Sequence, residues 1–297
     1  MNIIEVNNLT KTYGTLTAVD HISFTVEQGS MLGFLGINGA GKSTAINMLS
    51  TLLRPDSGTA TICGHRLGHE DEQIRRKIGI VHQQNVLDDL LSVRENLICR
   101  GILHGASPSE AAAQLNRLCG ILKLEDILGK RYKTLSGGQK RRCEIAAALM
   151  HTPQVLFLDE PTTGLDPATR KDVWQIIEML RRDQNMTVFL TTHYMEEAAE
   201  ADRIIILDHG RIIAGGTPFE LKDRYAKDKL RLFCTRELSG LPQGSTPTGF
   251  GYEIPLNRTL DALPILDALR DQVDGFEVIQ GNMDDVFLNA VGTELEA

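Results

Sequence analysis

The chain has 297 residues, of which 42% are hydrophobic and 24% charged, and this balance excludes a disordered protein because it supplies enough apolar side chains for a buried core. A formal net charge of −8 excludes a general electrostatic attraction to nucleic acid or anionic lipid. Apolar runs such as 155–158 and 204–207 are short, whereas a spanning helix needs about 20 apolar residues. We therefore expect a protein that does not cross a membrane.

The N-terminal sequence Met-Asn-Ile-Ile-Glu lacks the basic stretch, apolar core and cleavage site of a secretory signal. The five cysteines are odd in number and widely spaced, which suits a reducing compartment better than a disulfide framework. Both features predict a cytoplasmic protein.

The first third of the chain begins with β-like runs at 3–6, 21–26 and 31–34, separated by turns that contain Gly14 and Gly29. These runs predict a sheet. The pattern then changes to helical spacing, which continues until the Arg-Pro pair at 54–55; its apolar positions are Ile46, Leu49, Leu52 and Leu53.

A glycine-rich loop lies between the last of these strands and the helix. Residues 36–43 read Gly-Ile-Asn-Gly-Ala-Gly-Lys-Ser and fit the P-loop pattern G-x-x-x-x-G-K-[ST]. Glycines at these positions let backbone N–H groups surround phosphates at a helix N-terminus. We expect Lys42 to reach the β- and γ-phosphates and Ser43 to hold Mg²⁺. The candidate nucleotide contacts here are Gly36, Asn38, Gly39, Ala40, Gly41, Lys42, Ser43 and Thr44; the alternative is a purely structural turn.

The middle third is helix-rich. Residues 107–110, Ser-Pro-Ser-Glu, combine a cap, a proline and a glutamate as at a helix start. The apolar face of this helix is supplied by Leu115, Leu118, Ile121 and Leu122.

Residues 135–139 read Leu-Ser-Gly-Gly-Gln and precede a further helical stretch. Ser136 and Gln139 have the spacing of a capping box, and the simplest interpretation is a well-capped helix. However, Gly137 and Gly138 leave backbone amides accessible at the helix N-terminus, as anion binding requires.

An apolar strand at 155–158 ends in two carboxylates, Asp159 and Glu160. Such a pair suits the second half of a P-loop site, because Asp159 can hold the metal and Glu160 can polarise the attacking water. Taken alone, the pair could equally be a solvated strand end. Further strands at 188–191 and 204–207 alternate with helical stretches at 174–180 and 195–200, which predicts a largely parallel, helix-covered sheet.

The pentapeptide at 135–139 matches the signature of ABC ATPases without a mismatch, and over residues 2–225 the sequence resembles this family. The resemblance implies a P-loop α/β cassette with an antiparallel β subdomain and a helical subdomain at about 85–150. It also implies that Gln83 senses the metal, although Gln84 is adjacent and His82 replaces the family's usual proline.

The resemblance extends to three further positions. Asp166, in Gly-Leu-Asp-Pro at 164–167, resembles the D-loop aspartate, which implies a nucleotide contact, and His193 resembles the switch histidine that contacts the γ-phosphate. Tyr13 matches the aromatic residue that stacks on adenine, with core packing as its main alternative role.

By the same resemblance, two cassettes close head to tail around two ATP molecules. Ser136, Gly137, Gly138 and Gln139 would then meet the nucleotide held by the partner. The implied assembly is a homodimer of this chain in the ATP state with separate transmembrane permease subunits. The chain would be attached to the inner face of the cell membrane through the permease only, with no nucleic acid expected.

Residues 226–297 are expected to form a small α+β accessory domain, with a boundary near residue 225 and a linker or loop at 238–251. Its predicted elements are a strand at 229–235 and a helix at 260–271. Three segments, 162–167, 216–218 and 283–288, resemble the bacterial drug- and sodium-exporter branch of the family, which implies export.

Two alternatives remain open at this point. One is a soluble ABC ATPase that acts on ribosomes or DNA, although such relatives usually carry two cassettes or a long coiled coil. The other is a regulatory subunit that binds ATP without hydrolysing it, against which the intact Lys42, Asp159, Glu160 and His193 argue.

Overall fold

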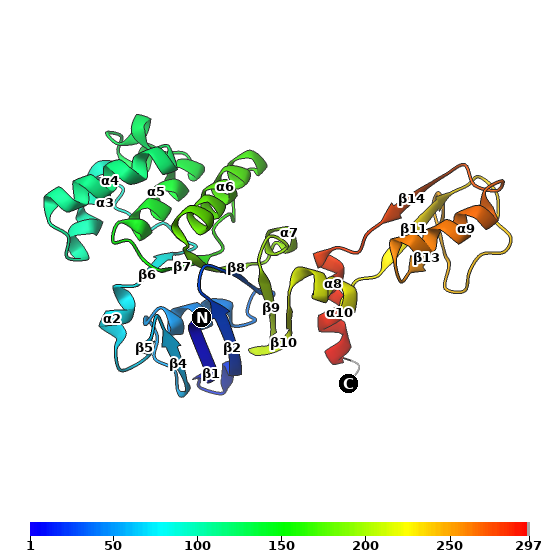
Figure 1. Cartoon of the computed structure of the whole chain (residues 1–297), viewed down its shortest axis with the longest axis horizontal. Coiled ribbons are helices and arrows are strands. Elements are labelled where there is room, and N and C mark those ends of the chain that lie inside the picture. The colour runs from blue at the N-terminus through cyan, green and yellow to red at the C-terminus, as the bar shows by residue number, and fades with distance from the viewer. Residues whose placement is uncertain (296–297) are drawn as a thin grey trace. The chain divides into compact units, whose positions relative to one another are not determined.

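The computed structural model describes residues 1–295, which form two compact units (Figure 1). The chain passes from the first unit to the second between Ile212 and Ile213, earlier than the boundary expected near residue 225. The reason is that α8 (Pro218–Tyr225) packs on α10 (Met283–Leu295), so the helix before the expected boundary belongs to the second unit.

A six-stranded sheet with the order β10-β9-β3-β8-β7-β6 lies at the centre of the first unit, and the chain passes into the second unit within its edge strand β10. The pairs β9/β3, β3/β8, β8/β7 and β7/β6 are parallel. Every residue of β3, β7 and β8 is buried, as is typical of parallel strands that are covered on both faces. The strands are β3 (Met31–Leu35), β6 (Ile78–Val81), β7 (Val155–Asp159), β8 (Thr187–Thr192), β9 (Arg203–Asp208) and β10 (Arg211–Gly216).

A second, antiparallel sheet has the order β2-β1-β4-β5. The side chains of both sheets share one hydrophobic core. In that core Phe34 of β3 packs 5.7 Å from Phe24 of β2 and 5.3 Å from Phe189 of β8, measured between ring centroids. The strands are β1 (Asn2–Tyr13), β2 (Leu16–Glu27), β4 (Ser57–Ile62) and β5 (His65–Arg66).

Three mutually packed helices, α3 (Val93–Leu103), α4 (Pro108–Leu122) and α5 (Gly137–Leu149), form the helical subdomain (Figure 1). Each begins with a serine in a complete capping box, including the predicted one at Ser107. The remaining helices of the first unit are α1 (Lys42–Leu49), α2 (Asp71–Arg75), α6 (Pro167–Gln184) and α7 (Met195–Ala198), with short 3-10 turns at Glu125–Ile127 and Tyr132–Thr134.

Helix α1 ends at Leu49, so the prediction that it continues to the Arg-Pro pair was wrong. Thr51 adopts a left-handed backbone conformation (φ 66°), which stops the helix before Leu52. Leu52 is 58% exposed and does not extend the apolar face that its spacing suggested.

The second unit contains an antiparallel sheet of the order β12-β13-β11-β14. Its strands are β11 (Asp228–Phe233), β12 (Thr246–Thr248), β13 (Gly251–Leu256) and β14 (Gly275–Ile279). Helix α9 (Ala262–Leu269) follows a 3-10 turn at Thr259–Asp261 and contributes to a separate core with Leu230, Leu232 and Ile254. The segment predicted as a loop at 238–251 thus includes the short strand β12.

None of the helices within residues 1–295 combines the length and the apolar character that crossing a bilayer requires.

Candidate active site

The P-loop connects the end of β3 to the start of α1. Gly41 stands immediately before the helix with φ 105°, and a Cβ atom there would lie 2.2 Å from the carbonyl oxygen of Ala18. Only glycine fits such a position. Helix α1 has no side-chain cap at Gly41 and no acidic residue in its first turn. Its first amides are therefore suited to an anion such as a phosphate.

The side chain of Lys42 lies within this loop and is only 5% exposed. Its Nζ donates to the carbonyl oxygens of Gly36 (2.7 Å) and Ile37 (3.1 Å) and lies 4.0 Å from Glu160 Oε1. Burial lowers the pKa of Lys42, while the charges of Glu160 and Asp159 act in the opposite direction. A buried cation beside free helix amides gives the loop the electrostatics of a phosphate site.

Asp159 is the last residue of β7 and meets Ser43 from the P-loop, with 3.5 Å between Asp159 Oδ1 and Ser43 Oγ. Thr191 Oγ1 donates to the same carboxylate oxygen at 2.6 Å. A hydroxyl and a carboxylate supply the hard oxygen ligands that Mg²⁺ prefers, so the residues present fit a magnesium ion. The sequence prediction for this pair included Ser43 and Asp159 but missed Thr191. Thr191 lies directly opposite Asp159 in the parallel β7/β8 pair, a register that no local sequence pattern specifies.

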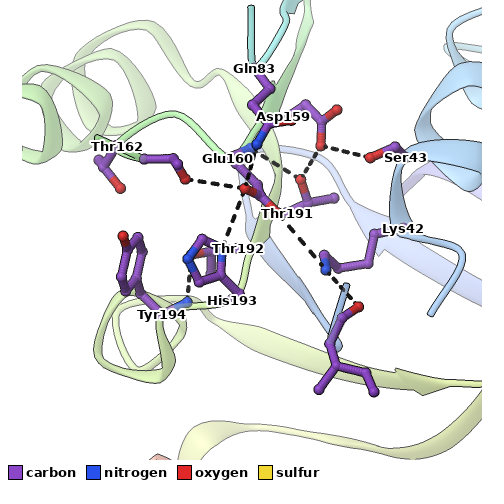
Figure 2. A network of polar contacts seen from close by, with 12 residues as sticks. Lys42, Ser43, Gln83, Asp159, Glu160, Thr162, Thr191, Thr192, His193 and Tyr194 are labelled. Atoms are coloured by element: carbon purple, nitrogen blue, oxygen red, sulfur yellow. Dashed lines mark hydrogen bonds and ion pairs between the residues drawn. The ribbon is translucent and has the colours of Figure 1, made fainter. Parts of the chain in front are cut away.

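Glu160 follows β7 and turns its carboxylate toward the same point as Lys42, Gln83 and His193 (Figure 2). Its backbone is left-handed (φ 47°), a conformation that is costly for a residue with a side chain and is held here by a hydrogen bond from its N–H to the carbonyl of Thr191 at 3.1 Å. Glu160 Oε2 accepts hydrogen bonds from Gln83 Nε2 at 3.0 Å and from Thr163 Oγ1 at 3.1 Å. The predicted water-polarising carboxylate is thus oriented by two donors.

The glutamine that reaches the site is Gln83. Gln83 and Gln84 are both exposed, and the contact with Glu160 is made by Gln83. This contact agrees with the expectation that Gln83, and not the adjacent Gln84, belongs to the site.

His193 follows β8, and its Nδ1 lies 3.3 Å from Glu160 Oε2. That approach lacks hydrogen-bond geometry, and this nitrogen has no hydrogen-bond partner among the described residues. An orphaned, buried nitrogen at the edge of a phosphate site fits a residue that contacts a ligand.

The loops that carry Glu160 and His193 are joined by Glu197 of α7. Its buried carboxylate accepts hydrogen bonds from Thr162 Oγ1 and, at 2.8 Å, from Thr192 Oγ1. Thr162 lies two residues after Glu160, and Thr192 lies directly before His193. The carboxylate of Glu197 therefore holds both loops. The sequence interpretation did not include Glu197.

The signature residues lie at the N-terminus of α5, where Ser136 caps the amide of Gln139. A Cβ atom on Gly138 would lie 2.2 Å from Thr169 Cγ2 of α6, so this glycine is also required for helix packing. Among the described residues no hydrogen bond links residues 136–139 to the P-loop. Within the described residues the two predicted halves of the nucleotide site are therefore not joined by hydrogen bonds.

Tyr13 and Asp166 lie apart from the group around Glu160. Tyr13 ends β1 with a half-exposed ring, which contradicts the alternative of core packing. Asp166 is the N-cap of α6 and accepts hydrogen bonds from the amides of Ala168 (3.1 Å) and Thr169 (3.0 Å). The hydrogen bond from the Thr169 side chain lowers the pKa of Asp166.

A sequence model of the ABC transporter family matches residues 19–163. The chain is 42% identical over 305 aligned residues to the daunorubicin/doxorubicin resistance ATP-binding protein DrrA of Streptomyces peucetius, covering 97% of this chain and 92% of the relative. It is 36% identical to the Nod factor export ATP-binding protein I of Paraburkholderia xenovorans (strain LB400), covering 99% and 98%.

Two solved structures have the same fold in the cassette region. One is the dimeric post-hydrolysis state of the ATP-binding cassette MJ0796 bound to ADP and Pi, with a TM-score of 0.66, 30% identity, and coverage of 72% of this chain and 98% of that one. The other is cbiO1 from Clostridium perfringens, part of the cbiONQ transporter complex, with a TM-score of 0.69, 28% identity, and coverage of 74% and 90%.

Proposed function

The chain belongs to the ABC transporter family as an ATP-binding and ATP-hydrolysing subunit, and we propose that it drives export through separate transmembrane permease subunits. Export is supported by the relatives that are named for drug resistance and Nod factor export and that align over nearly the whole chain. The observation that carries the proposal is the convergence of Lys42, Gln83, Glu160 and His193 beside the Ser43–Asp159 pair.

In this proposal the P-loop amides and Lys42 bind the phosphates of ATP, and Tyr13 stacks on the adenine. Ser43 and Asp159, with Gln83, hold Mg²⁺, which neutralises charge on the phosphates. Glu160 orients and polarises the attacking water, and His193 contacts the γ-phosphate. The donors around Glu160 support this division of roles, because a carboxylate that accepts from Gln83 and Thr163 is held in one orientation.

We further propose that two copies of the chain enclose two ATP molecules in the family's head-to-tail arrangement. The likeness to the dimeric cassette MJ0796 bound to ADP and Pi supports this, and each chain would then need a partner to complete its site. Ser136, Gly137, Gly138 and Gln139 would contact the partner's nucleotide, and Asp166 is a further candidate nucleotide contact. The assembled protein would lie at the inner face of the cell membrane, attached only through the permease, and the second unit would be an accessory domain.

The test is size-exclusion chromatography of the Glu160→Gln variant with and without ATP and Mg²⁺, together with ATPase assays of the unmodified chain. We expect the Glu160→Gln variant to form a dimer only when ATP is present. We expect its rate of ATP hydrolysis to be about 10²- to 10⁴-fold below that of the unmodified chain, because the amide cannot accept the water's proton. Glu196→Gln, which changes an exposed carboxylate on α7, is the matched control.

Three outcomes would contradict parts of the proposal. A variant that stays monomeric despite bound ATP would remove the homodimer. An unmodified chain that binds ATP without turnover would indicate a regulatory subunit. Copurification with ribosomes or DNA, and with no membrane partner, would replace the transport function.

A further inference from the structure

Arg141 lies on α5, one turn after the signature residues, and is only 5% exposed. Its guanidinium donates to main-chain carbonyl oxygens in two distant segments. Nη1 donates to His82 at 2.6 Å. Nη2 donates to Glu160 at 2.8 Å, and Nε donates to Pro161. Arg141 therefore contacts the residue before Gln83 and the backbone of Glu160 itself.

This pattern is unusual for a buried cation, which is normally paired with a carboxylate. Among the described residues Arg141 has no ion-pair partner within 4.0 Å, and its hydrogen bonds are to carbonyl oxygens. Burial lowers its pKa, with Glu144 opposing the effect. A planar guanidinium fixes the directions of its N–H groups, so satisfying several carbonyls at once sets the positions of those carbonyls relative to α5.

Glu144, one turn further along α5, holds the other end of the same loop. Its Oε1 accepts hydrogen bonds from the amides of Val86 (2.9 Å) and Leu87 (3.2 Å) and from the hydroxyl of Tyr132 (2.6 Å). Helix α5 thus binds the loop that contains Gln83 on both sides, with Arg141 before it and Glu144 after it. Arg141 alone also reaches the backbone of Glu160.

We infer that Arg141 is a positioning residue for ATP hydrolysis, which links the signature helix to Gln83 and Glu160 of the same chain. The inference rests on the proposed roles of Gln83 and Glu160. If Ser136, Gly137 and Gly138 meet the partner's nucleotide, then α5 connects that nucleotide to the hydrolytic groups of its own chain. A displacement of α5 moves Arg141, and Arg141 in turn moves the segments that carry Gln83 and Glu160. Arg141 thereby couples the two ATP sites of a dimer.

The experiment compares Arg141→Met with Arg142→Met in the full chain. Arg142 is the matched control, because it is adjacent on the same helix but donates to the carbonyls of Leu122 (3.4 Å) and Lys123 (3.1 Å) at the end of α4. We measure kcat, the ATP concentration dependence of hydrolysis, and the Kd of ATP with Mg²⁺ by titration. Displacing catalytic groups by an ångström can cost about 100-fold in rate.

For Arg141→Met we expect kcat to fall by about 10- to 100-fold with a Kd close to that of the unmodified chain, since the P-loop is untouched. We also expect any cooperativity between the two ATP sites to be lost. Amide hydrogen exchange should accelerate at residues 82–87 and at Asp159 and Glu160 in this variant but not in Arg142→Met. The control should retain kcat and Kd.

Arg141→Lys retains the positive charge, but its single nitrogen cannot reach both segments in the geometry of the guanidinium. We expect Arg141→Lys to fold and to have a kcat between those of Arg141→Met and the unmodified chain. Arg141→Lys therefore tests the inference even if Arg141→Met does not fold. An unchanged kcat in Arg141→Lys and, where it folds, in Arg141→Met would overturn the inference. Parallel loss of kcat and ATP affinity in the folded variants would also overturn it, because the residue would then act on binding.

The Glu160→Gln variant separates this inference from the proposed function. If Glu160→Gln hydrolyses ATP at the rate of the unmodified chain, the proposed role of the site fails. If Glu160→Gln is inactive and the Arg141 variants are fully active, only the role of Arg141 fails.

Discussion

Lys42 Nζ and Glu160 Oε1 lie 4.0 Å apart, and both side chains are at least nine-tenths buried. Lys42 belongs to the phosphate loop after β3, and Glu160 follows β7 of the same sheet. The pair therefore connects the proposed phosphate-binding residues to the carboxylate proposed to orient the attacking water. Each charge partly compensates the other in a region with little water. This relationship leads to the first prediction.

Lys42→Met should weaken ATP binding by about 10- to 100-fold, because a charge-assisted contact to the phosphates is worth about 1.5–3 kcal/mol. Glu160 should keep its contacts with Gln83 and Thr163. Isothermal titration with ATP and Mg²⁺ measures the change. Lys171→Met, on the exposed side of α6, is the control and should bind ATP normally. Unchanged affinity in Lys42→Met would refute the phosphate role.

Tyr13→Ala should weaken ADP binding, because base stacking on an aromatic ring contributes about 1–3 kcal/mol. Tyr13→Phe keeps the ring and should bind ADP nearly as well as the unmodified chain. Since the Tyr13 ring is 50% exposed, the melting temperature should change little in either variant. A large loss of Tm with unchanged ADP affinity would instead indicate a packing role. Both quantities can be measured on the same preparations by titration and calorimetry.

Gly138→Ala should destabilise the first unit by about 1–3 kcal/mol, because the new methyl group would lie 2.2 Å from Thr169 Cγ2. Thr169→Ser removes that methyl group and keeps the hydroxyl that bonds to Asp166, so the double variant should recover much of the loss. Gly137→Ala is the control, since its Cβ would be 3.6 Å from the nearest neighbouring atom, on Leu165. Urea unfolding of the four proteins tests this packing; equal stabilities of the two alanine variants would contradict it.

Stability should fall as the pH drops from about 6.5 toward 4, and His151 should contribute to this fall. Its ring stacks on His104 at 3.9 Å and its Nε2 lies 2.8 Å from the carbonyl oxygen of Ile78. Burial, followed by the charge of His104, lowers the pKa of His151 to about 4. The unfolded chain, with a histidine pKa of about 6.5, binds a proton there that the folded chain excludes. The contribution is therefore complete above that pH and decreases by up to about 3 kcal/mol toward pH 4.

His151→Gln should reduce the slope of unfolding free energy against pH in this window, by up to about 1.4 kcal/mol per pH unit. His209→Gln, which changes a histidine side chain that is 90% exposed, is the matched control. Urea unfolding at pH 7, 6, 5 and 4 provides the comparison. Identical slopes for His151→Gln and the unmodified chain would refute a proton-excluding His151.

The sequence by itself determined the local parts of the site. A glycine loop between a strand and a helix, and two carboxylates after an apolar strand, are recognisable because their backbone geometry depends on neighbouring residues. The structure has each of these elements where they were predicted, with β3 before the P-loop and Asp159 at the end of β7. Caps such as Ser107 and Ser136 were readable for the same reason.

Only the tertiary structure decided which distant residues meet. Gln83 is 77 residues from Glu160, and its contact with that carboxylate could not be derived locally, since a loop has no periodicity that assigns a direction to a side chain. Thr191 reaches Asp159 because β8 lies beside β7 in a particular register, which no local pattern specifies. Arg141 is one of three consecutive basic residues at 140–142, and its contacts with main-chain carbonyls exist only because α5 is packed against two loops. Packing between distant segments depends on the whole core, so these contacts could not be derived from the residues next to them in the chain.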